Sequence, residues 1–516
     1  MHFDLIFMLN KIHSCSVIGL SSELVEVESD VTRGMFRFSV VGLPDAAVSE
    51  SRDRVFSAIK NSGLTFPRQR VTVNLAPADL KKEGPAYDLP IALSLLSTTG
   101  QLGFDTKEKL FVGELSLKGE VRPVNGVLSI AIEAKRKGFM ELFVPEENAK
   151  EAALVRGLKV YPVTNLLGLK DHLEGMNFIT PVAPLNLKNL ETNTLYEVDL
   201  ACVHGQEHVK RALEIAAAGG HNILMNGPPG SGKTLLARSF PSILPKMTLI
   251  EALEVTRIYS VSGLLPKDKP LILERPFRAP HHTASGVSLV GGGAYPKPGE
   301  ISLAHRGVLF LDEFPEFSRN VLENLRQPLE DGVITISRAQ GSMSFPAKFT
   351  LVAAMNPCPC GYLSDPERPC VCSPSEIIRY QKRISGPLLD RIDLHLEVPR
   401  VKYEKLASEE LAESSALVRE RVQKARTIQE ERFKNSQQKK RIIANGEMGN
   451  TEIRRFCVSD STSRALLKNA VESFHLSARS YYRILRLART IADLEAAEQI
   501  KSEYIAEALQ YRQHES

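Results

Sequence analysis

The stretch Gly227–Thr234 constrains the fold of this chain more than any other segment. It reads Gly-Pro-Pro-Gly-Ser-Gly-Lys-Thr and matches the phosphate-binding pattern G-x-x-x-x-G-K-[ST] at every fixed position. An apolar segment, Ile223–Met225, precedes it, and a segment typical of a helix start, Leu235–Arg238, follows it. Such a loop joins a strand to a helix, because its backbone N–H groups and the helix N-terminus surround one anion. The sequence therefore predicts an α/β nucleotide-binding core, with a glycine-rich turn as the alternative.

Two further motifs predict hydrolysis. Lys233 is expected to reach the β- and γ-phosphates of ATP, and Thr234 to ligate Mg²⁺. Gly307–Glu313 reads as an apolar strand that ends in two acids, where Asp312 would hold Mg²⁺ and Glu313 would orient and deprotonate the attacking water. A strand that ends in two surface acids is the alternative. The nucleotide-binding residues are expected to be Gly227, Pro228, Pro229, Gly230, Ser231, Gly232, Lys233 and Thr234.

Another apolar strand, Phe349–Met355, ends in Asn356. A polar side chain there can hydrogen-bond the attacking water or the γ-phosphate, although Asn before Pro is also common in turns. Strands that are apolar throughout are buried on both faces, which predicts a parallel sheet covered by helices.

The 516 residues allow two to four domains. Alternating strand-like and helix-like segments occupy residues 1–178, a Pro- and Asn-rich linker 179–197, the ATPase core 198–400, and a helical region 401–516. The net charge of +4 argues neither for nor against a nucleic-acid partner. We expect a cytoplasmic protein without a membrane partner, because no apolar segment approaches the ~20 residues of a membrane helix.

Four of the seven cysteines lie within fifteen positions. Four thiolates on two short turns can surround Zn²⁺ tetrahedrally, although C-x-C pairs are less typical of zinc sites than C-x-x-C pairs. A redox disulfide pair and incidental cysteines are the alternatives. A zinc ion with four protein ligands would be structural. The predicted ligands are Cys358, Cys360, Cys370 and Cys372.

Together these motifs resemble AAA+ ATPases of the magnesium-chelatase type, in the helix-2-insert branch, and more narrowly the YifB/ComM-like family. The resemblance covers nearly the whole chain. It implies Arg391 as a finger that acts on the neighbouring subunit and Arg479 as a sensor from the subunit's own helical lid, with Arg383 and Arg483 as alternatives. Surface ion pairs are the usual role of arginines. Further motifs that carry the resemblance are Gly205–Glu207, Phe277–Thr283, Gly291–Gly293, Ala353–Gly361, Ser385–Asp393 and Arg486–Asp493.

The resemblance also assigns two pore elements. Phe277–Glu300 would be the helix-2 insert, and Gly332–Phe345 a second hairpin with Arg338 near its tip. A cation at the tip of a pore hairpin suits a polyanion such as DNA, whereas a solvated turn is the alternative reading of Arg338.

The N-terminal region resembles the proteolytic domain of Lon, of the S5-like α+β type, through Lys82–Asp88 and Gly113–Pro123. Ala86 occupies the place of the catalytic serine, and Val127–Ile130 contains no lysine. A Ser–Lys dyad needs both groups, so we expect the fold to be retained and the peptidase activity to be lost.

We therefore expect an ATP-hydrolysing, Mg²⁺-dependent ring, a homo-oligomer and in particular a hexamer. The family implies a DNA translocase or helicase that promotes branch migration of single-stranded or branched recombination intermediates in natural transformation. The alternatives are a metal-insertion motor of the magnesium-chelatase type and a protein-remodelling chaperone.

Overall fold

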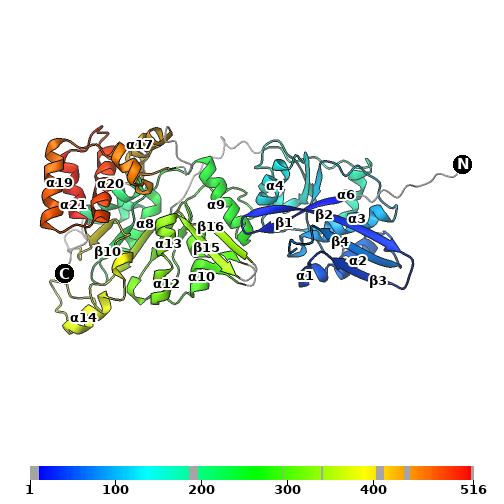
Figure 1. Ribbon diagram of the computed structural model, residues 1–516, viewed down its shortest axis with the longest axis horizontal. Helices are drawn as coiled ribbons and strands as arrows, with labels where there is room; N and C mark the ends of the chain where they lie inside the picture. The colour runs from blue at the N-terminus through cyan, green and yellow to red at the C-terminus, as the bar shows by residue number, and fades with distance from the viewer. Residues whose placement is uncertain are drawn as a thin grey trace. The chain divides into compact units, whose positions relative to one another are not determined.

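The computed structural model describes residues 11–184, 196–293, 296–338, 341–401, 412–434 and 442–512, which form two compact units (Figure 1). The first unit comprises Met1–Glu191 and Ala252–Ile272, and the second comprises Thr192–Glu251 and Leu273–Ser516. None of the helices in the described ranges has the length and apolar character needed to cross a membrane.

A seven-stranded mixed sheet forms the first unit, in the order β3-β4-β2-β1-β5-β8-β9. β2 is antiparallel to β1 and β4, whereas β5, β8 and β9 continue from β1 in parallel. Its strands are β1 Ile12–Ile18, β2 Ser21–Thr32, β3 Arg37–Val41, β4 Arg70–Ala76, β5 Lys109–Phe111, β8 Glu141–Pro145 and β9 Lys159–Val163, beside the small pair β6 Glu114–Leu115 and β7 Val121–Arg122.

Alternating side chains of these strands enter two separate hydrophobic cores. Phe111 and Phe143 belong to the core that holds α2, α3 and α6, whereas Leu110 and Leu142 belong to the core that holds α4 and α5. The sheet is therefore covered on both faces. The helices of this part are α1 Ala46–Ser49, α2 Ser51–Asn61, η1 Pro85–Tyr87, α3 Asp88–Thr98, α4 Val127–Arg136, α5 Glu146–Ala152 and α6 Leu166–Leu173.

Helix α9, Leu249–Ser262, contributes most of its length to the first unit. Its side chains Val255 and Ile258 are fully buried. Arg257 Nε donates a hydrogen bond to Ser129 Oγ at 3.0 Å, and Ser260 Oγ donates one to the buried carboxylate of Glu151. The first unit is thus completed by a segment that lies 60 residues beyond its main body in the sequence.

The second unit contains a five-stranded sheet in the order β11-β14-β17-β10-β18, and every neighbouring pair is parallel. All residues of β14 and β17 are buried, as continuous apolar strands predict. The carboxyl ends of parallel strands meet at one edge, where α/β proteins bind ligands. The strands are β10 Ile223–Asn226, β11 Phe277–Arg278, β14 Val308–Leu311, β17 Thr350–Met355 and β18 Leu394–Glu397.

Helices surround this sheet, and the described C-terminal residues from 412 onward are helical and turn structure (orange to red in Figure 1). Within the expected helical region 401–516, the first described helix is α17, Ser415–Lys434; residues 402–411 lie outside the described ranges. The other helices are η2 Leu200–Cys202, α7 Glu207–Gly219, α8 Lys233–Ile243, η3 Phe314–Glu316, α12 Arg319–Glu323, α13 Arg326–Asp331, α14 Pro374–Gln381, α15 Gly386–Leu389, η4 Asn445–Glu447, α18 Asn450–Phe456, α19 Ser461–Ser473, α20 Ala478–Leu494 and α21 Ser502–Gln510.

The expected insert, Phe277–Glu300, is closed by an ion pair at its two ends. Arg278 donates to both carboxylate oxygens of Glu300, at 2.6 and 2.7 Å. Bidentate pairs of this kind fix geometry as well as adding energy. Between these ends lie α10 Gly286–Val290 and the strands β12 Gly291–Gly292 and β13 Lys297–Pro298, and α11 Glu300–Leu303 follows.

The second expected hairpin is formed by β15, Val333–Arg338, and β16, Gly341–Pro346 (Figure 1). The strands pair antiparallel from Val333 opposite Pro346 to Arg338 opposite Gly341. Arg338 is therefore at the end of the paired region, as expected. Its side chain and residues 339–340 lie outside the described part of the chain.

Candidate active site

The loops at the carboxyl edge of the parallel sheet bring the expected nucleotide site together. β10 leads into Gly227–Thr234, β14 into Asp312 and Glu313, and β17 into Asn356. Gly232 adopts a left-handed φ of +87° directly before α8, a conformation that favours glycine. Because α8 begins at Lys233, its unpaired N-terminal N–H groups face this loop. Sequence motifs that are up to 130 residues apart thus meet at one edge.

Lys233 and Asn356 contact each other. Lys233 Nζ donates to the carbonyl oxygens of Gly227 at 2.8 Å and Pro228 at 2.9 Å, and lies 3.3 Å from Asn356 Oδ1. Burial lowers the pKa of Lys233. The loop therefore holds a partly desolvated cation next to the polar side chain expected to contact the γ-phosphate.

Thr234 and Asp312 also meet. Thr234 Oγ1 donates a hydrogen bond to Asp312 Oδ2 at 2.8 Å. A hydroxyl and a carboxylate are hard oxygen ligands of the kind that Mg²⁺ prefers. With the cationic Lys233 and the N-terminus of α8, these groups fit a magnesium nucleotide, which supplies the phosphoanhydride bond and the metal charge for hydrolysis.

The side chain of Glu313 has a partner that the sequence did not predict. Glu313 Oε2 lies 2.9 Å from Nδ1 of His282, which belongs to the insert. The backbone of Glu313 is left-handed, with φ of 51°, and its N–H donates to Asp312 Oδ1 at 2.9 Å. In the sequence, His281 and His282 stand out only as part of the motif Phe277–Thr283. Their position shortly after the edge strand β11 is the signal that points to the same sheet edge.

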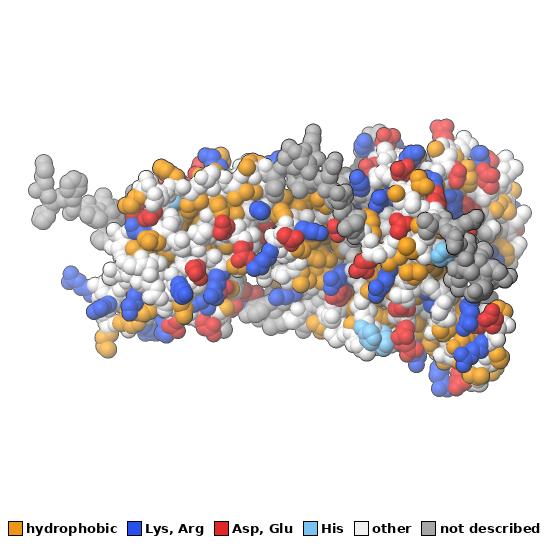
Figure 2. Space-filling model, turned by 180° about the vertical axis from the view of Figure 1, so that it is seen from behind, with side chains coloured by type: hydrophobic (Ala, Val, Ile, Leu, Met, Phe, Trp, Pro, Cys, Tyr) orange, Lys and Arg blue, Asp and Glu red, His pale blue; other side chains and the backbone are white. Residues whose placement is uncertain are grey.

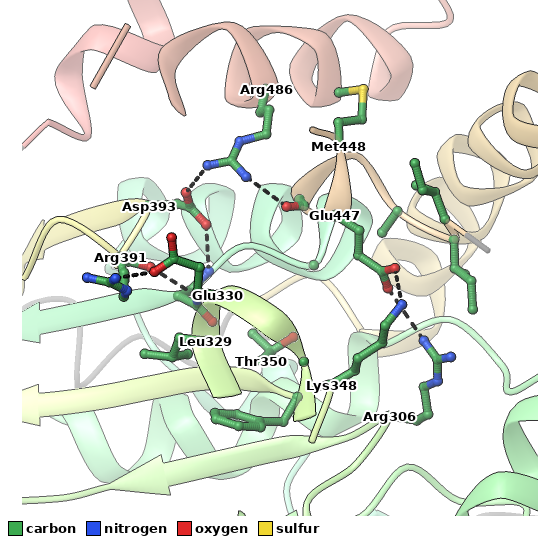
Figure 3. Close-up of a pocket in the computed structure, with 18 of the residues that line it drawn as sticks. Arg306, Leu329, Glu330, Lys348, Thr350, Arg391, Asp393, Glu447, Met448 and Arg486 are labelled. Carbon is green, nitrogen blue, oxygen red and sulfur yellow. Dashed lines mark hydrogen bonds and ion pairs between the residues drawn. The ribbon is translucent and has the colours of Figure 1, made fainter. Parts of the chain in front are cut away.

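A cavity of about 500 Å³ lies at the opposite, amino edge of the sheet (Figure 3). Its lining includes Asn222 and Gly307, which directly precede β10 and β14, and Thr350, the first residue of β17. Charged side chains of both signs surround it and pair with one another, including Lys348 with Glu447 at 2.5 Å.

Arg391 and Arg479 both line this cavity and both bind Glu330 of α13. Arg391 Nη2 donates to Glu330 Oε2, and Arg479 Nη2 lies 3.4 Å from Glu330 Oε1. The hydrogen bond from Arg391, with the charges of both arginines, lowers the pKa of Glu330. Arg479, expected to act on its own subunit's nucleotide, thus lies at the amino edge of the sheet, whereas Lys233 and Thr234 lie at its carboxyl edge.

The two alternative arginines have other partners. Arg383 Nη1 binds Glu316 Oε2 at 2.7 Å on an exposed surface. Arg483 is buried and donates to the carbonyl oxygen of Ile392 at 2.8 Å, which gives it a structural role.

The four clustered cysteines converge. All four Sγ atoms lie within 4.8 Å of one another, and all four thiols are free. Three of the pairs are separated by 3.4 to 3.6 Å. Sulfurs about 2.3 Å from a zinc ion form a tetrahedron with edges of about 3.8 Å, so this donor set fits zinc. The loop also contacts the nucleotide site, because Gly361 packs against Pro229 of the phosphate-binding loop.

The region that resembles Lon offers no free nucleophile at the expected place. Ala86 replaces the serine, and Ser129 is buried, donating its hydroxyl to the carbonyl of Leu20 at 2.8 Å while it accepts from Arg257. The Ser129 hydroxyl therefore already donates one hydrogen bond and accepts another.

A parallel sheet with this phosphate-binding loop, an Asp-Glu strand end and a polar residue on the neighbouring strand defines an AAA+ ATPase. The chain belongs to the magnesium-chelatase subunit I-like family, of the YifB/ComM type. Three models of this family match it: "Magnesium chelatase, subunit ChlI" at residues 199–406, "Subunit ChlI of Mg-chelatase" at 27–148 and "Magnesium chelatase, subunit ChlI C-terminal" at 412–512.

Full-length relatives support the same assignment. The chain is 45% identical over 507 residues to "Competence protein ComM" of Haemophilus influenzae, covering 97% of each chain. It is 42% identical over 507 residues to the YifB protein of Escherichia coli, covering 98% of this chain and 97% of YifB. A partial match, 24% identical over 159 residues, relates 28% of the chain to 20% of the Lon protease of Rhizobium meliloti.

Proposed function

We propose that this protein is a ring-forming AAA+ motor that hydrolyses ATP to translocate DNA and to promote branch migration of recombination intermediates. The proposal of a ring rests on where the reactive groups lie relative to the sheet. Lys233, Thr234 and Asp312 lie at the carboxyl edge of the sheet, whereas Arg391 and Arg479 lie at the amino edge.

One chain cannot bring both edges of its sheet to one nucleotide. A second copy can, if its amino edge faces the first chain's carboxyl edge. Such a head-to-tail interface uses two different surfaces and closes into a ring when the rotation between copies closes. We therefore assign both Arg391 and Arg479 to the nucleotide of the neighbouring subunit, in a hexamer.

Each residue then has a defined task. Lys233 and the N-terminus of α8 bind the phosphates, and Thr234 and Asp312 hold the magnesium ion. Glu313 accepts the proton of the attacking water, and Asn356 orients that water or the γ-phosphate. Arg391 and Arg479 of the neighbour neutralise the charge that develops on the transferred group.

The proposal that DNA is the cargo rests on two observations: a relative is named a competence protein, and Arg338 lies at the end of the hairpin. The overall charge gives no support for DNA binding, because basic (blue) and acidic (red) side chains are interspersed on the face shown in Figure 2. One such cation from each subunit of the proposed ring would contact successive phosphates.

The direct test uses the purified full-length protein on a mobile four-way or three-stranded junction with ATP. We expect strand movement that requires Glu313 and is lost in Glu313→Gln. An Arg338→Ala variant should retain ATPase activity and move strands less well. Intact ATPase activity without strand movement would refute the proposal.

A metal-insertion motor is the second candidate, favoured by the family and by a 28% identity over 196 residues to a magnesium-chelatase 67 kDa subunit of Heliobacterium mobile. A remodelling chaperone is the third. Comparing ATPase stimulation by DNA, by metalloporphyrin precursors and by unfolded protein separates the three.

We further propose that Cys358, Cys360, Cys370 and Cys372 bind one structural Zn²⁺. Elemental analysis of the purified protein should give one zinc per chain, and Cys370→Ser should lower it. Cys202→Ser, at an exposed cysteine elsewhere, is the matched control. Zinc-free protein with all four thiols titratable would contradict the proposal.

A further inference from the structure

Arg426 of α17 is a buried cation that lines the cavity at the amino edge of the sheet. Only 9% of the residue is exposed, and its one hydrogen bond within the described ranges runs from Nη2 to the carbonyl oxygen of Ala217, at 2.8 Å. A guanidinium carries five N–H groups, and the buried Nε of Arg426 has no partner. Because buried donors are nearly always hydrogen-bonded, this side chain requires an explanation.

The two cavity carboxylates whose charges act on Arg426 are held by other cations. Glu251 pairs with Arg275 at 3.2 Å. Glu447 pairs with Lys348 at 2.5 Å. Burial, together with the charge of Arg275, lowers the pKa of Arg426 to about 10, so the side chain is still charged at neutral pH. The cavity therefore contains a positive charge that no described side chain neutralises.

The bond of Arg426 to Ala217 is a helix cap. Ala217 lies in the last turn of α7, where carbonyl groups need donors from outside the helix. Gln429 of α17 donates to the next carbonyl, that of Ala218, at 3.1 Å. Since a neutral amide serves that carbonyl, capping α7 does not explain why position 426 carries a positive charge.

Further unpaired donors lie around the same cavity. The Nε atoms of Arg391 and Arg486 are also buried without a partner, and both residues line it. Guanidinium groups bind phosphate oxygens through their paired N–H donors. The volume of about 500 Å³ lies in the range of small-molecule sites, and a buried side chain such as Arg426 is out of reach of a polymer.

We propose that this cavity binds the phosphate group of a small ligand, whose charge Arg426 neutralises. Two sources could supply the group: inorganic phosphate, which ATP hydrolysis releases, and the phosphates of a second nucleotide. The site is separate from the phosphate-binding loop, which lies at the opposite edge of the sheet. The inference depends neither on DNA as the cargo nor on a ring.

The test is a calorimetric titration of the nucleotide-free, full-length protein with inorganic phosphate. We expect two binding events per chain, of which Lys233→Ala should remove the one at the phosphate-binding loop. Arg426→Gln should weaken the other by about 10- to 100-fold, the effect of losing hydrogen bonds to a charged group. Arg421→Gln is the matched control on the same helix; it removes a side chain that is 41% exposed and paired with Glu413, and should keep both events.

Two measurements separate this role from a structural one. Without phosphate, Arg426→Gln should unfold at the same or a higher temperature than the unchanged protein, because a buried charge without a partner is removed. Arg426→Lys keeps the charge and should retain the event at reduced affinity. A second event that is missing from the unchanged protein, intact in Arg426→Gln or absent from Arg426→Lys would overturn the proposal.

A non-hydrolysable ATP analogue distinguishes the two sources. Two analogue molecules per chain, reduced to one in Arg426→Gln, would identify the phosphates of a second nucleotide. One analogue molecule per chain in both proteins, with the phosphate event still sensitive to Arg426→Gln, would identify inorganic phosphate.

Discussion

Gly361 joins the cysteine loop to the phosphate-binding loop, and Gly361→Ala tests what this contact does for catalysis. Gly361 has φ of +85°, and an added Cβ would lie 2.6 Å from Cδ and 2.7 Å from Cγ of Pro229. Because ordinary contacts begin near 3.4 Å, the ring of Pro229 must move by roughly 1 Å, a displacement that can cost up to about 100-fold in rate when it reaches reacting groups.

The substitution has two effects that can be separated. An L-residue in the left-handed region costs about 1–2 kcal/mol of stability wherever it occurs. Gly100 has φ of +73° with nothing within 4 Å of its Cβ position, so Gly100→Ala carries the strain without the clash. We expect both variants to lose stability, and only Gly361→Ala to lose about 10-fold or more in kcat/KM for ATP.

The assays are thermal unfolding and ATPase kinetics, with binding of a fluorescent ATP analogue as a third measurement. Equal kcat/KM values for the two glycine variants would refute the reasoning, because the cysteine loop would then have no effect on the phosphate-binding loop.

Three further predictions concern single carboxylates. Glu313→Gln should bind ATP normally, in equilibrium binding, and hydrolyse it at least about 100-fold more slowly. Asp493, 1% exposed, accepts hydrogen bonds from Arg432 and Arg489, so Asp493→Asn should lower the free energy of unfolding by about 3–5 kcal/mol in urea titrations. Burial raises the pKa of Asp88 from 3.8 to about 6, so Asp88 binds a proton more tightly in the folded protein than in the unfolded chain. Its contribution to the free energy of unfolding should therefore fall as the pH rises from about 4 to about 6, and Asp88→Asn should make the pH dependence in this range smaller.

Much of the nucleotide site could be predicted because parallel strands have a simple geometry. Once Ile223–Met225, Val308–Leu311 and Phe349–Met355 are recognised as neighbouring strands, the residues that follow them must share one edge. The contacts of Lys233 with Asn356 and of Thr234 with Asp312 follow from that rule.

The residues that escaped prediction are positioned by loops and by packing between distant helices. No periodicity tells which edge of the sheet the start of α20 will reach, so the proximity of Arg479 to Glu330 could not be foreseen. The contact of His282 with Glu313 depends on the path of an irregular segment after β11. In α9 the apolar residues indicate burial, but burial alone does not say against which core.

The first unit is built from two separate stretches of the sequence, and this affects how the protein can be divided into fragments. A fragment that ends in the linker 179–197 lacks Arg257 and Ser260, and so leaves the buried carboxylate of Glu151 without its hydroxyl donor. The complementary fragment carries α9 with Val255 and Ile258 deprived of their core. Proteolysis at the linker would cut the chain without freeing either half, and the halves expressed together should fold better than either one alone.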